Sequence, residues 1–186
     1  MEHRADIFWC TGMSGAGKST LVEYTKNKLE EQGYSVLILD GDAVREKYKV
    51  KLGFGREDVK RNNYYVAKLC EEDRDNYDVI MVPIISPIDN VRRKVKSILS
   101  PKYNLVYICA EIESLKKRDK KGLYKKSDDG EITDLIGYSD TNPYDIPEDY
   151  DLIINTSKES DLEKSKQLFQ TFVMSKTVKS TALLNK

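Results

Sequence analysis

Short runs of apolar residues recur along the chain, and segments with helical periodicity separate them. Apolar runs this short predict buried β-strands, and they lie at 7–10, 36–39, 79–82, 105–109 and 152–154. Helices are expected from Thr20 as far as Gly33, and over 57–75, 90–99 and 161–173. Strands that alternate with helices predict an α/β fold with a doubly wound, mainly parallel sheet.

The pattern predicts one domain followed by a tail. A chain of 186 residues with 39% hydrophobic residues can build one sizeable core. We expect residues 1–175 to form this domain. Its last helix begins with Ser160 and Glu163 at capping-box spacing. Residues 176–186 show no pattern and are expected to form a flexible C-terminal tail.

The segment 119–150 interrupts the alternation. It has no clear period, and it is punctuated by Gly122, Gly130, Gly137, Pro143 and Pro147. A basic cluster lies at its start, made of Arg118, Lys120, Lys121, Lys125 and Lys126. A loop this long is usually disordered or functional. We expect a lid whose basic side chains face a site for several phosphates; a solvated charged loop is the alternative.

The charge balance argues against general nucleic-acid binding. Lys plus Arg and Asp plus Glu each number 31, so the chain has no overall basic field to attract a nucleic acid. Any recognition of anions must therefore be local.

The cysteines, the apolar stretches and the single histidine indicate the cellular compartment and restrict the possible catalytic chemistry. Three widely spaced cysteines are typical of reduced thiols in an intracellular protein. The longest apolar stretches are far too short to cross a membrane, so we expect a soluble, cytoplasmic protein without a membrane partner. The single histidine, His3, lies near the N-terminus. This excludes Ser-His triads and histidine metal sites.

A phosphate-binding motif follows the first predicted strand. Residues 12–20 read GMSGAGKST, which satisfies the P-loop pattern G-x-x-x-x-G-K-[ST]. The loop lies between a strand and a helix, so its N–H groups and the helix N-terminus converge on one anion. Lys18 can reach the outer phosphates of a nucleotide, and the Ser19 hydroxyl can ligate Mg²⁺. The expected phosphate-binding residues are Gly12, Ser14, Gly15, Ala16, Gly17, Lys18, Ser19 and Thr20. A simple strand-to-helix turn is the alternative.

A second group of polar residues follows the second predicted strand. Asp40 and Asp42 flank a glycine, and Arg45 comes soon after. Ligands of an open parallel sheet bind at the carboxyl ends of its strands, so these side chains should share a crevice with the P-loop. Asp42 could orient an acceptor hydroxyl, take its proton or hold Mg²⁺ through water, and Arg45 could bind an anionic group. Alternatively, Asp42 caps the next helix and Arg45 is its solvated partner.

Two further residues have an ordinary and a functional interpretation. Phe54 could stack on a base beside the crevice, although a core position is more common for such a residue. Ser86 follows the third strand, where it could cap the next helix or line the crevice.

Taken together, these segments resemble the adenylylsulfate kinase family. The resemblance covers about 7–156. It rests on GMSGAGKST, LDGDAVR at 39–45, LGF at 52–54, ISP at 85–87, RDKKGLYKK at 118–126, GEI at 130–132 and PYDIPE at 143–148. It implies a P-loop nucleoside-kinase-like three-layer sandwich with a lid loop. The implied activity is Mg-ATP-dependent phosphorylation of the 3′-hydroxyl of adenylyl sulfate, and a homodimer is also implied.

The resemblance also implies roles for individual residues. The implied catalytic residues are Lys18, Asp40, Asp42 and Ser86, with Asp42 as the base that orients the hydroxyl. Arg118 would lie against the adenine of ATP and Thr156 near that base. The implied acceptor and lid contacts are Arg45, Phe54, Asn62, Ile85, Ser86, Lys121, Gly122 and Leu123. In some relatives the position of Ser86 can be phosphorylated.

The chain departs from the family pattern on the acceptor side. Val59 stands where relatives usually have an arginine, Leu135 is read as the position of a second stacking phenylalanine, and Ile88 replaces an aromatic residue. A lost base stack weakens binding by about 1–3 kcal/mol, unless Arg56, Arg61 or Tyr64 compensates. We therefore expect a divergent adenylylsulfate kinase or a related kinase for another anionic nucleotide or sugar hydroxyl. A catalytically silent ATP-binding module is a weaker alternative, because Lys18, Ser19 and Asp42 are all present.

Overall fold

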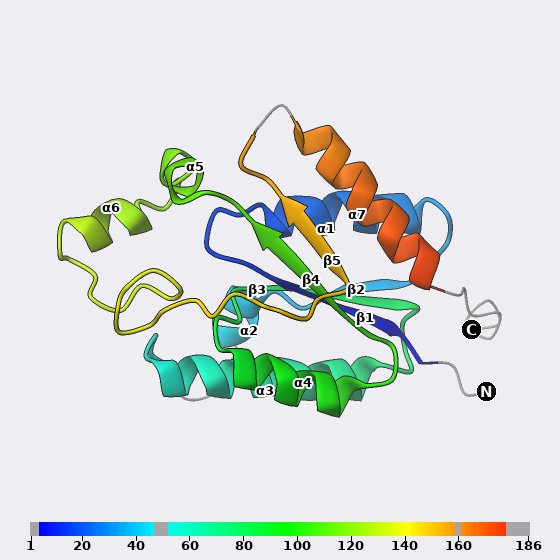
Figure 1. Cartoon of the computed structure of the whole chain (residues 1–186). Coiled ribbons are helices and arrows are strands. Elements are labelled where there is room, and N and C mark those ends of the chain that lie inside the picture. The colour runs from blue at the N-terminus through cyan, green and yellow to red at the C-terminus, as the bar shows by residue number, and fades with distance from the viewer. Residues whose placement is uncertain (1–3, 47–51, 159–160, 178–186) are drawn as a thin grey trace.

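A computed structural model describes residues 4–46, 52–158 and 161–177. Its centre is a five-stranded sheet with the order β2-β3-β1-β4-β5 (Figure 1), and every pairing is parallel. The strands are β1 (Asp6–Thr11), β2 (Val36–Ile38), β3 (Val79–Ile84), β4 (Tyr103–Cys109) and β5 (Leu152–Asn155). Each coincides with a predicted apolar run, so the predicted parallel α/β fold is confirmed.

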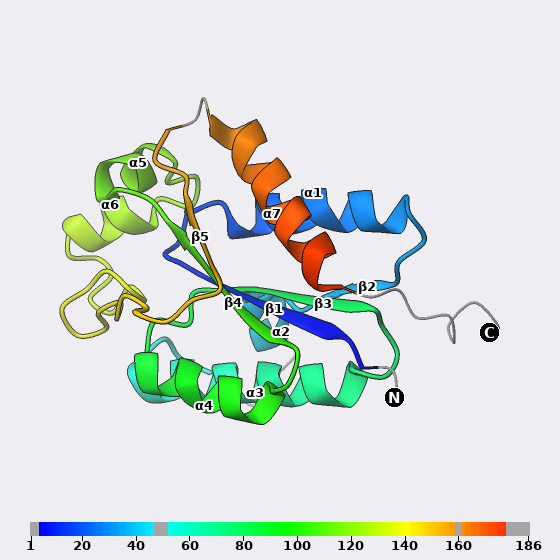
Figure 2. The same ribbon diagram turned by 45° about the vertical axis from the view of Figure 1, so that its right-hand side comes forward.

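Helices cover both faces of the sheet. Figure 2 shows α1 and α7 on one face, α3 and α4 on the other, and α5 and α6 beyond the carboxyl ends of the strands. The long helices are α1 (Lys18–Glu30), α3 (Arg56–Asp73), α4 (Asp89–Leu99) and α7 (Leu162–Lys176). The short ones are α2 (Gly41–Glu46), α5 (Ile112–Lys117) and α6 (Leu123–Asp128). The molecule is therefore a three-layer sandwich whose functional loops gather at one end.

The two faces of the sheet have separate hydrophobic cores. In β1, Ile7 and Trp9 pack with α3 and α4, whereas Phe8 and Cys10 pack with α1 and α7. Successive strand residues point to opposite faces, and all four of these are fully buried. Burial on both faces explains why the strands read as continuous apolar runs.

Two segments differ from the sequence prediction. The lid segment is not structureless, because α6 lies within it, and α5 precedes it. The last helix extends to Lys176, and Thr177 is buried after it, so the start of the predicted tail belongs to the folded part. Ser160, the first residue of the predicted capping box, and residues 178–186 lie outside the described residues. Within the described residues, none of the helices is both long and apolar enough to cross a membrane.

Gly12 begins the P-loop where the backbone passes very close to β4. A Cβ atom at this position would lie 2.1 Å from the carbonyl oxygen of Ile108. We expect Gly12→Ala to lower the free energy of unfolding by about 1–3 kcal/mol, because strand backbone cannot move aside cheaply. Gly55→Ala is the matched control, since its Cβ would meet no atom within 4 Å. Thermal unfolding of the two variants tests this; equal stability would contradict it.

Candidate active site

A cleft of about 700 Å³ opens at the carboxyl ends of the strands, a volume suited to a nucleotide-sized ligand. The P-loop and the segment after β2 line the same cleft. It is lined by most of the predicted site residues, namely Ser14, Gly15, Gly17, Lys18, Ser19, Thr20, Asp40, Asp42, Arg45, Asn62, Ile85, Ser86, Arg118, Lys121 and Thr156. The predicted residues outside its lining are Gly12, Ala16, Phe54, Gly122 and Leu123.

The P-loop lysine lies over its own loop. Lys18 is the first residue of α1, and its Nζ donates to the carbonyl oxygens of Gly12 at 2.7 Å and Met13 at 2.9 Å. Burial lowers the pKa of this ammonium group to about 8, although Asp42 and then Asp40 act in the opposite direction. A bound polyphosphate would favour the charged form and offer stronger acceptors than the two carbonyl groups.

Asp40 and Asp42, the two acidic residues after β2, have different roles. Asp40 Oδ1 accepts hydrogen bonds from the backbone N–H groups of Asp42 at 2.9 Å and Ala43 at 3.2 Å, which caps α2. The interpretation of Asp42 as the cap is therefore wrong, and its carboxylate stays exposed. Its Oδ2 lies 3.2 Å from the Nζ of Lys121 in the lid segment. This contact joins the two sides of the cleft.

Arg45 and Phe54 lie against each other at the outer end of the cleft. The guanidinium carbon of Arg45 is 5.1 Å from the centre of the Phe54 ring, and Arg45 also donates to the carbonyl of Gly53. The core interpretation of Phe54 is wrong, because its side chain is 55% exposed. The lid reaches this corner too, since Asn142 Nδ2 donates to the Phe54 carbonyl at 2.8 Å.

Ser86 has an unusual backbone conformation. Its φ of 46° lies in the left-handed region that non-glycine residues seldom occupy. The buried side chain of Arg92 holds this conformation by donating from Nη1 to the Ser86 carbonyl at 2.8 Å. The capping interpretation is wrong, because α4 begins at Asp89 without a side-chain cap. Ser86 instead lines the cleft.

Residues of α3 and the lid close the inner end of the cleft. Asn62 donates from Nδ2 to the Gly41 carbonyl at 3.3 Å, and Val59 lies buried beside it in the lining. The reading of Leu135 as a cleft position is wrong. Leu135 is buried in the core on the side of α1 and α7, whereas its neighbour Ile136 lines the cleft. Leu135 begins a turn, since its carbonyl accepts from the N–H groups of Tyr138 and Ser139, both at 3.0 Å, and this turn separates the directions of the two neighbouring side chains.

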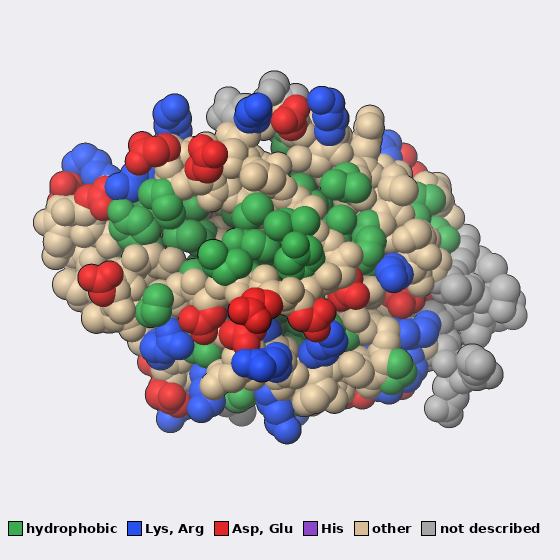
Figure 3. All heavy atoms as spheres, in the orientation of Figure 1, with side chains coloured by type: hydrophobic (Ala, Val, Ile, Leu, Met, Phe, Trp, Pro, Cys, Tyr) green, Lys and Arg blue, Asp and Glu red, His purple; other side chains and the backbone are tan. Residues whose placement is uncertain are grey.

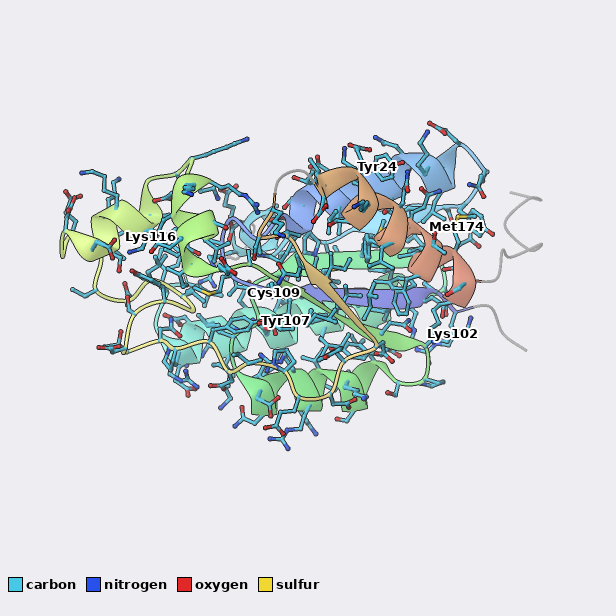
Figure 4. All side chains as sticks on the ribbon, turned by 45° about the horizontal axis from the view of Figure 1, so that its top comes forward. Tyr24, Lys102, Tyr107, Cys109, Lys116 and Met174 are labelled. Atoms are coloured by element: carbon cyan, nitrogen blue, oxygen red, sulfur yellow. The ribbon has the colours of Figure 1, made fainter. Side chains whose placement is uncertain are left out.

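The base of the lid is attached to the P-loop. The Asp119 carboxylate accepts from the backbone N–H groups of Leu123 and Tyr124, both at 2.8 Å, and so orders the start of α6. The Tyr124 hydroxyl donates to the Ser14 carbonyl at 2.7 Å. Lys116 of α5, labelled in Figure 4, pairs with Asp128 at 2.8 Å. Gly122 and Leu123 therefore serve this junction rather than the cleft wall.

Hydrogen bonds of Arg118 and Thr156 connect three segments at the P-loop end of the cleft, and the cleft lining also includes residues that the motifs did not reveal. Arg118 donates to the carbonyl groups of Thr156 and Ser157, and Thr156 Oγ1 donates to the Ala16 carbonyl at 2.9 Å. These bonds connect the lid base, β5 and the P-loop. Lys158, Leu162 and Ser165 also line the cleft. Only the packing of α7 beside β5 brings them there, so no local pattern could have indicated them.

A threonine at the end of β1 joins three parts of the site. Thr11 Oγ1 donates to the Ile85 carbonyl at 2.5 Å and lies 2.8 Å from the hydroxyl of Tyr144. The Tyr144 ring stacks on Tyr107 of β4 at 6.0 Å (Figure 4 labels Tyr107). The P-loop, the end of β3 and the returning lid segment are thus connected through one side chain.

Comparisons with known proteins agree with this geometry. The family model described as adenylylsulphate kinase matches residues 4–155. A probable adenylyl-sulfate kinase of Bacillus subtilis is 35% identical over 94% of this chain and 88% of its own length. An adenylyl-sulfate kinase of Halothermothrix orenii is 38% identical over 87% of this chain and 86% of its own. The structure of the Mycobacterium tuberculosis APS kinase CysC with AMPPNP and APS has a TM-score of 0.80 at 30% identity, covering 92% of this chain and 98% of that one.

Proposed function

The chain belongs to the adenylylsulphate kinase family, and on that premise we propose that it transfers the γ-phosphoryl group of ATP to the 3′-hydroxyl of adenylyl sulfate. The products are ADP and 3′-phosphoadenylyl sulfate. One observation carries the proposal: the P-loop after β1 and the acidic pair after β2 line one cleft. A donor phosphate held by the first can therefore face an acceptor hydroxyl held by the second.

The residues of the cleft suit a reaction that depends on positioning and charge. Phosphoryl transfer needs the attacking and leaving oxygens in line, and charge on the transferred group must be stabilised. We assign the phosphate chain to the P-loop N–H groups and Lys18. Asp42 is the proposed base, because its carboxylate is exposed and makes no helix cap. It would orient the acceptor hydroxyl and take its proton.

Oxygen ligands for Mg²⁺ lie where the proposal needs them. The Ser19 hydroxyl and the carboxylates of Asp40 and Asp42 line the cleft, and Mg²⁺ prefers oxygen donors completed by water and phosphate. Ser19 would therefore hold the ion directly, with Asp40 or Asp42 acting through water. When bound, Mg²⁺ supplies positive charge beside the phosphates.

The lid would separate the bound substrates from water. Lys121 would exchange its contact with Asp42 for the phosphates of ATP, which releases the proposed base. Arg118 and Thr156 would lie at the adenine of ATP. Exclusion of water limits hydrolysis of ATP without an acceptor.

An acceptor screen tests the proposal directly. The pure protein is given Mg-ATP with adenylyl sulfate, and separately with other nucleotides and with sugars. Phosphorylation of adenylyl sulfate above every other acceptor is expected. Preference for another nucleotide or sugar would favour a related kinase, and ATP binding without turnover of any acceptor would favour a silent module.

The lowered pKa of Lys18 predicts how ATP affinity depends on pH. Above about pH 8 the free protein has lost this proton, whereas the complex with ATP needs it. We expect the dissociation constant of a non-hydrolysable ATP analogue to rise about tenfold per pH unit above 8. Unfolding does not explain this loss, because a lysine whose pKa is lowered by folding adds stability as pH rises.

Calorimetric titrations between pH 7 and 9.5 measure this dependence. Lys18→Arg is the control, since a guanidinium group stays charged over the whole range, and its curve should be flat. A flat curve for the unchanged protein would contradict the assignment of Lys18.

Phe54 is the proposed stacking surface for the acceptor base. Its ring is exposed and lies against Arg45. We expect Phe54→Ala to raise the KM for adenylyl sulfate about tenfold or more and to leave the KM for ATP unchanged, because stacking contributes about 1–3 kcal/mol per base. Ile98→Ala, on the partly exposed face of α4, is the control. Steady-state kinetics with each substrate varied would refute the role if both constants stayed the same.

The expected homodimer remains a prediction. Figure 3 shows a band of hydrophobic side chains over the face that carries β5 and α7. Tyr150, Ile153 and Leu168 are among the exposed residues of this region. Light scattering of the purified protein measures its mass in solution and tests the prediction.

A further inference from the structure

Two adjacent asparagines lie on the buried side of α3. Asn62 and Asn63 are each only 2% exposed. Asn63 follows Val59 by one helical turn and precedes Ala67 by another, so it occupies the apolar stripe that packs on the sheet. Asparagine is unfavourable at such a position unless its amide is fully hydrogen-bonded.

Hydrogen bonds fix the orientation of both amides. The Nδ2 atom of Asn63 donates to the Val59 carbonyl at 2.9 Å, and the Nδ2 atom of Asn62 donates to the Gly41 carbonyl at 3.3 Å. A carbonyl group can only accept, so the amide nitrogens must face these carbonyls. The two Oδ1 atoms are therefore left as acceptors.

Among the described residues, neither amide oxygen has a hydrogen-bond partner. Both are buried and make no hydrogen bond within the described residues, and the same holds for the Ser86 hydroxyl oxygen. All three residues line the cleft, and its lining also includes the apolar residues Val59, Ile84 and Ile136. Such buried acceptors are costly unless a ligand or water supplies donors.

We propose that Asn63 Oδ1 accepts a hydrogen bond from a donor group on the phosphoryl acceptor, and that Asn63 is a specificity-determining residue. This inference rests on the proposed function. The group must carry N–H or O–H donors, which adenylyl sulfate offers as its purine 6-amino group or its ribose 2′-hydroxyl. Its phosphate and sulfate oxygens only accept, so they cannot supply this hydrogen bond.

Two analogues distinguish the sources of the donor. Inosine 5′-phosphosulfate replaces the amino group with an oxygen, and 2′-deoxyadenylyl sulfate lacks the hydroxyl. We expect the unchanged protein to prefer adenylyl sulfate over one of them by about a hundredfold in kcat/KM, because a site with unpaired acceptors rejects an analogue without the donor. Asn63→Leu should lower that preference at least about tenfold.

The same variant should gain thermal stability, because leucine removes an unsatisfied group from an apolar stripe. Thr25→Val is the matched control: Thr25 Oγ1 is also buried without a partner, but this residue lies on α1 and outside the cleft lining. Its variant should be stabilised without any change in preference.

Each outcome decides the question. A loss of preference in Asn63→Leu with retained or raised stability supports the proposal. Lower stability with unchanged preference shows a structural role and overturns it. If Asn63→Leu does not fold, the unchanged protein still provides the test, since equal use of both analogues and adenylyl sulfate overturns the proposal. Absence of any turnover of adenylyl sulfate overturns the proposed function and this inference together.

Discussion

Lys18→Ala is expected to lower kcat/KM about a hundredfold to a thousandfold with every acceptor. In the proposed complex, the ammonium group is the cation that lies beside the phosphates of ATP. It already lies 2.7 Å from the Gly12 carbonyl of the loop. A preorganised charge aimed at the transferred group accounts for about 3–4 kcal/mol of transition-state stabilisation in comparable sites. Alanine at this position would leave the negative charge of the transferred phosphoryl group unbalanced.

The fold should survive this substitution. Burial lowers the pKa of Lys18, so the folded state does not favour its charge, and its removal should leave thermal unfolding almost unchanged. Lys28→Ala, at an exposed position near the end of the same helix, is the control and should keep full activity. Turnover of Lys18→Ala within tenfold of the unchanged protein would contradict the assigned role.

Asp42→Asn should lower kcat about 10²- to 10⁴-fold while ATP affinity changes little. General bases contribute effects of this size, and an amide cannot take the proton of the acceptor hydroxyl. The backbone should stay in place, because Asp40 rather than Asp42 caps α2. The substitution also removes the ion pair with Lys121, an exposed contact of small energy.

Asp75→Asn serves as the comparison for Asp42→Asn, since Asp75 is an exposed carboxylate beyond the end of α3. Single-turnover kinetics separate the chemical step from substrate binding. A kcat within threefold of that of the unchanged protein would assign the proton transfer to another group.

The main elements could be predicted because each depends on a local pattern. Buried strands appear as short apolar runs, and α3 and α4 have the periodicity of long amphipathic helices. The helices α2, α5 and α6 have only six residues each, which is too short for a periodic signal. The strand order could not be derived either, because it depends on which side each crossover takes.

In the site, too, features that depend on local sequence could be predicted, whereas features that depend on tertiary contacts could not. The P-loop could be recognised from spacing alone, since all of its residues lie in one continuous segment, 12–20. The sequence left open whether Asp42 caps the helix after β2, because Asp40 and Asp42 both have suitable side chains and only geometry decides. Tyr144 gave no signal of its own, because its hydroxyl meets Thr11, which is distant in sequence. Asn63 gave none because its place in the cleft depends on other segments of the chain.

Strand β3 lies between β1 and β2 and pairs with both. The P-loop after β1 and the acidic pair Asp40 and Asp42 after β2 are therefore two strand spacings apart, about 10 Å across the sheet. Main-chain hydrogen bonds between the strands set that separation, whereas α3 and the lid lie outside the sheet and contact the segment after β2. Substitutions in α3 or the lid can thus change which acceptor binds without changing the distance between its hydroxyl and the donor phosphate. A kinase of this fold can therefore acquire a new acceptor while its sheet stays unchanged.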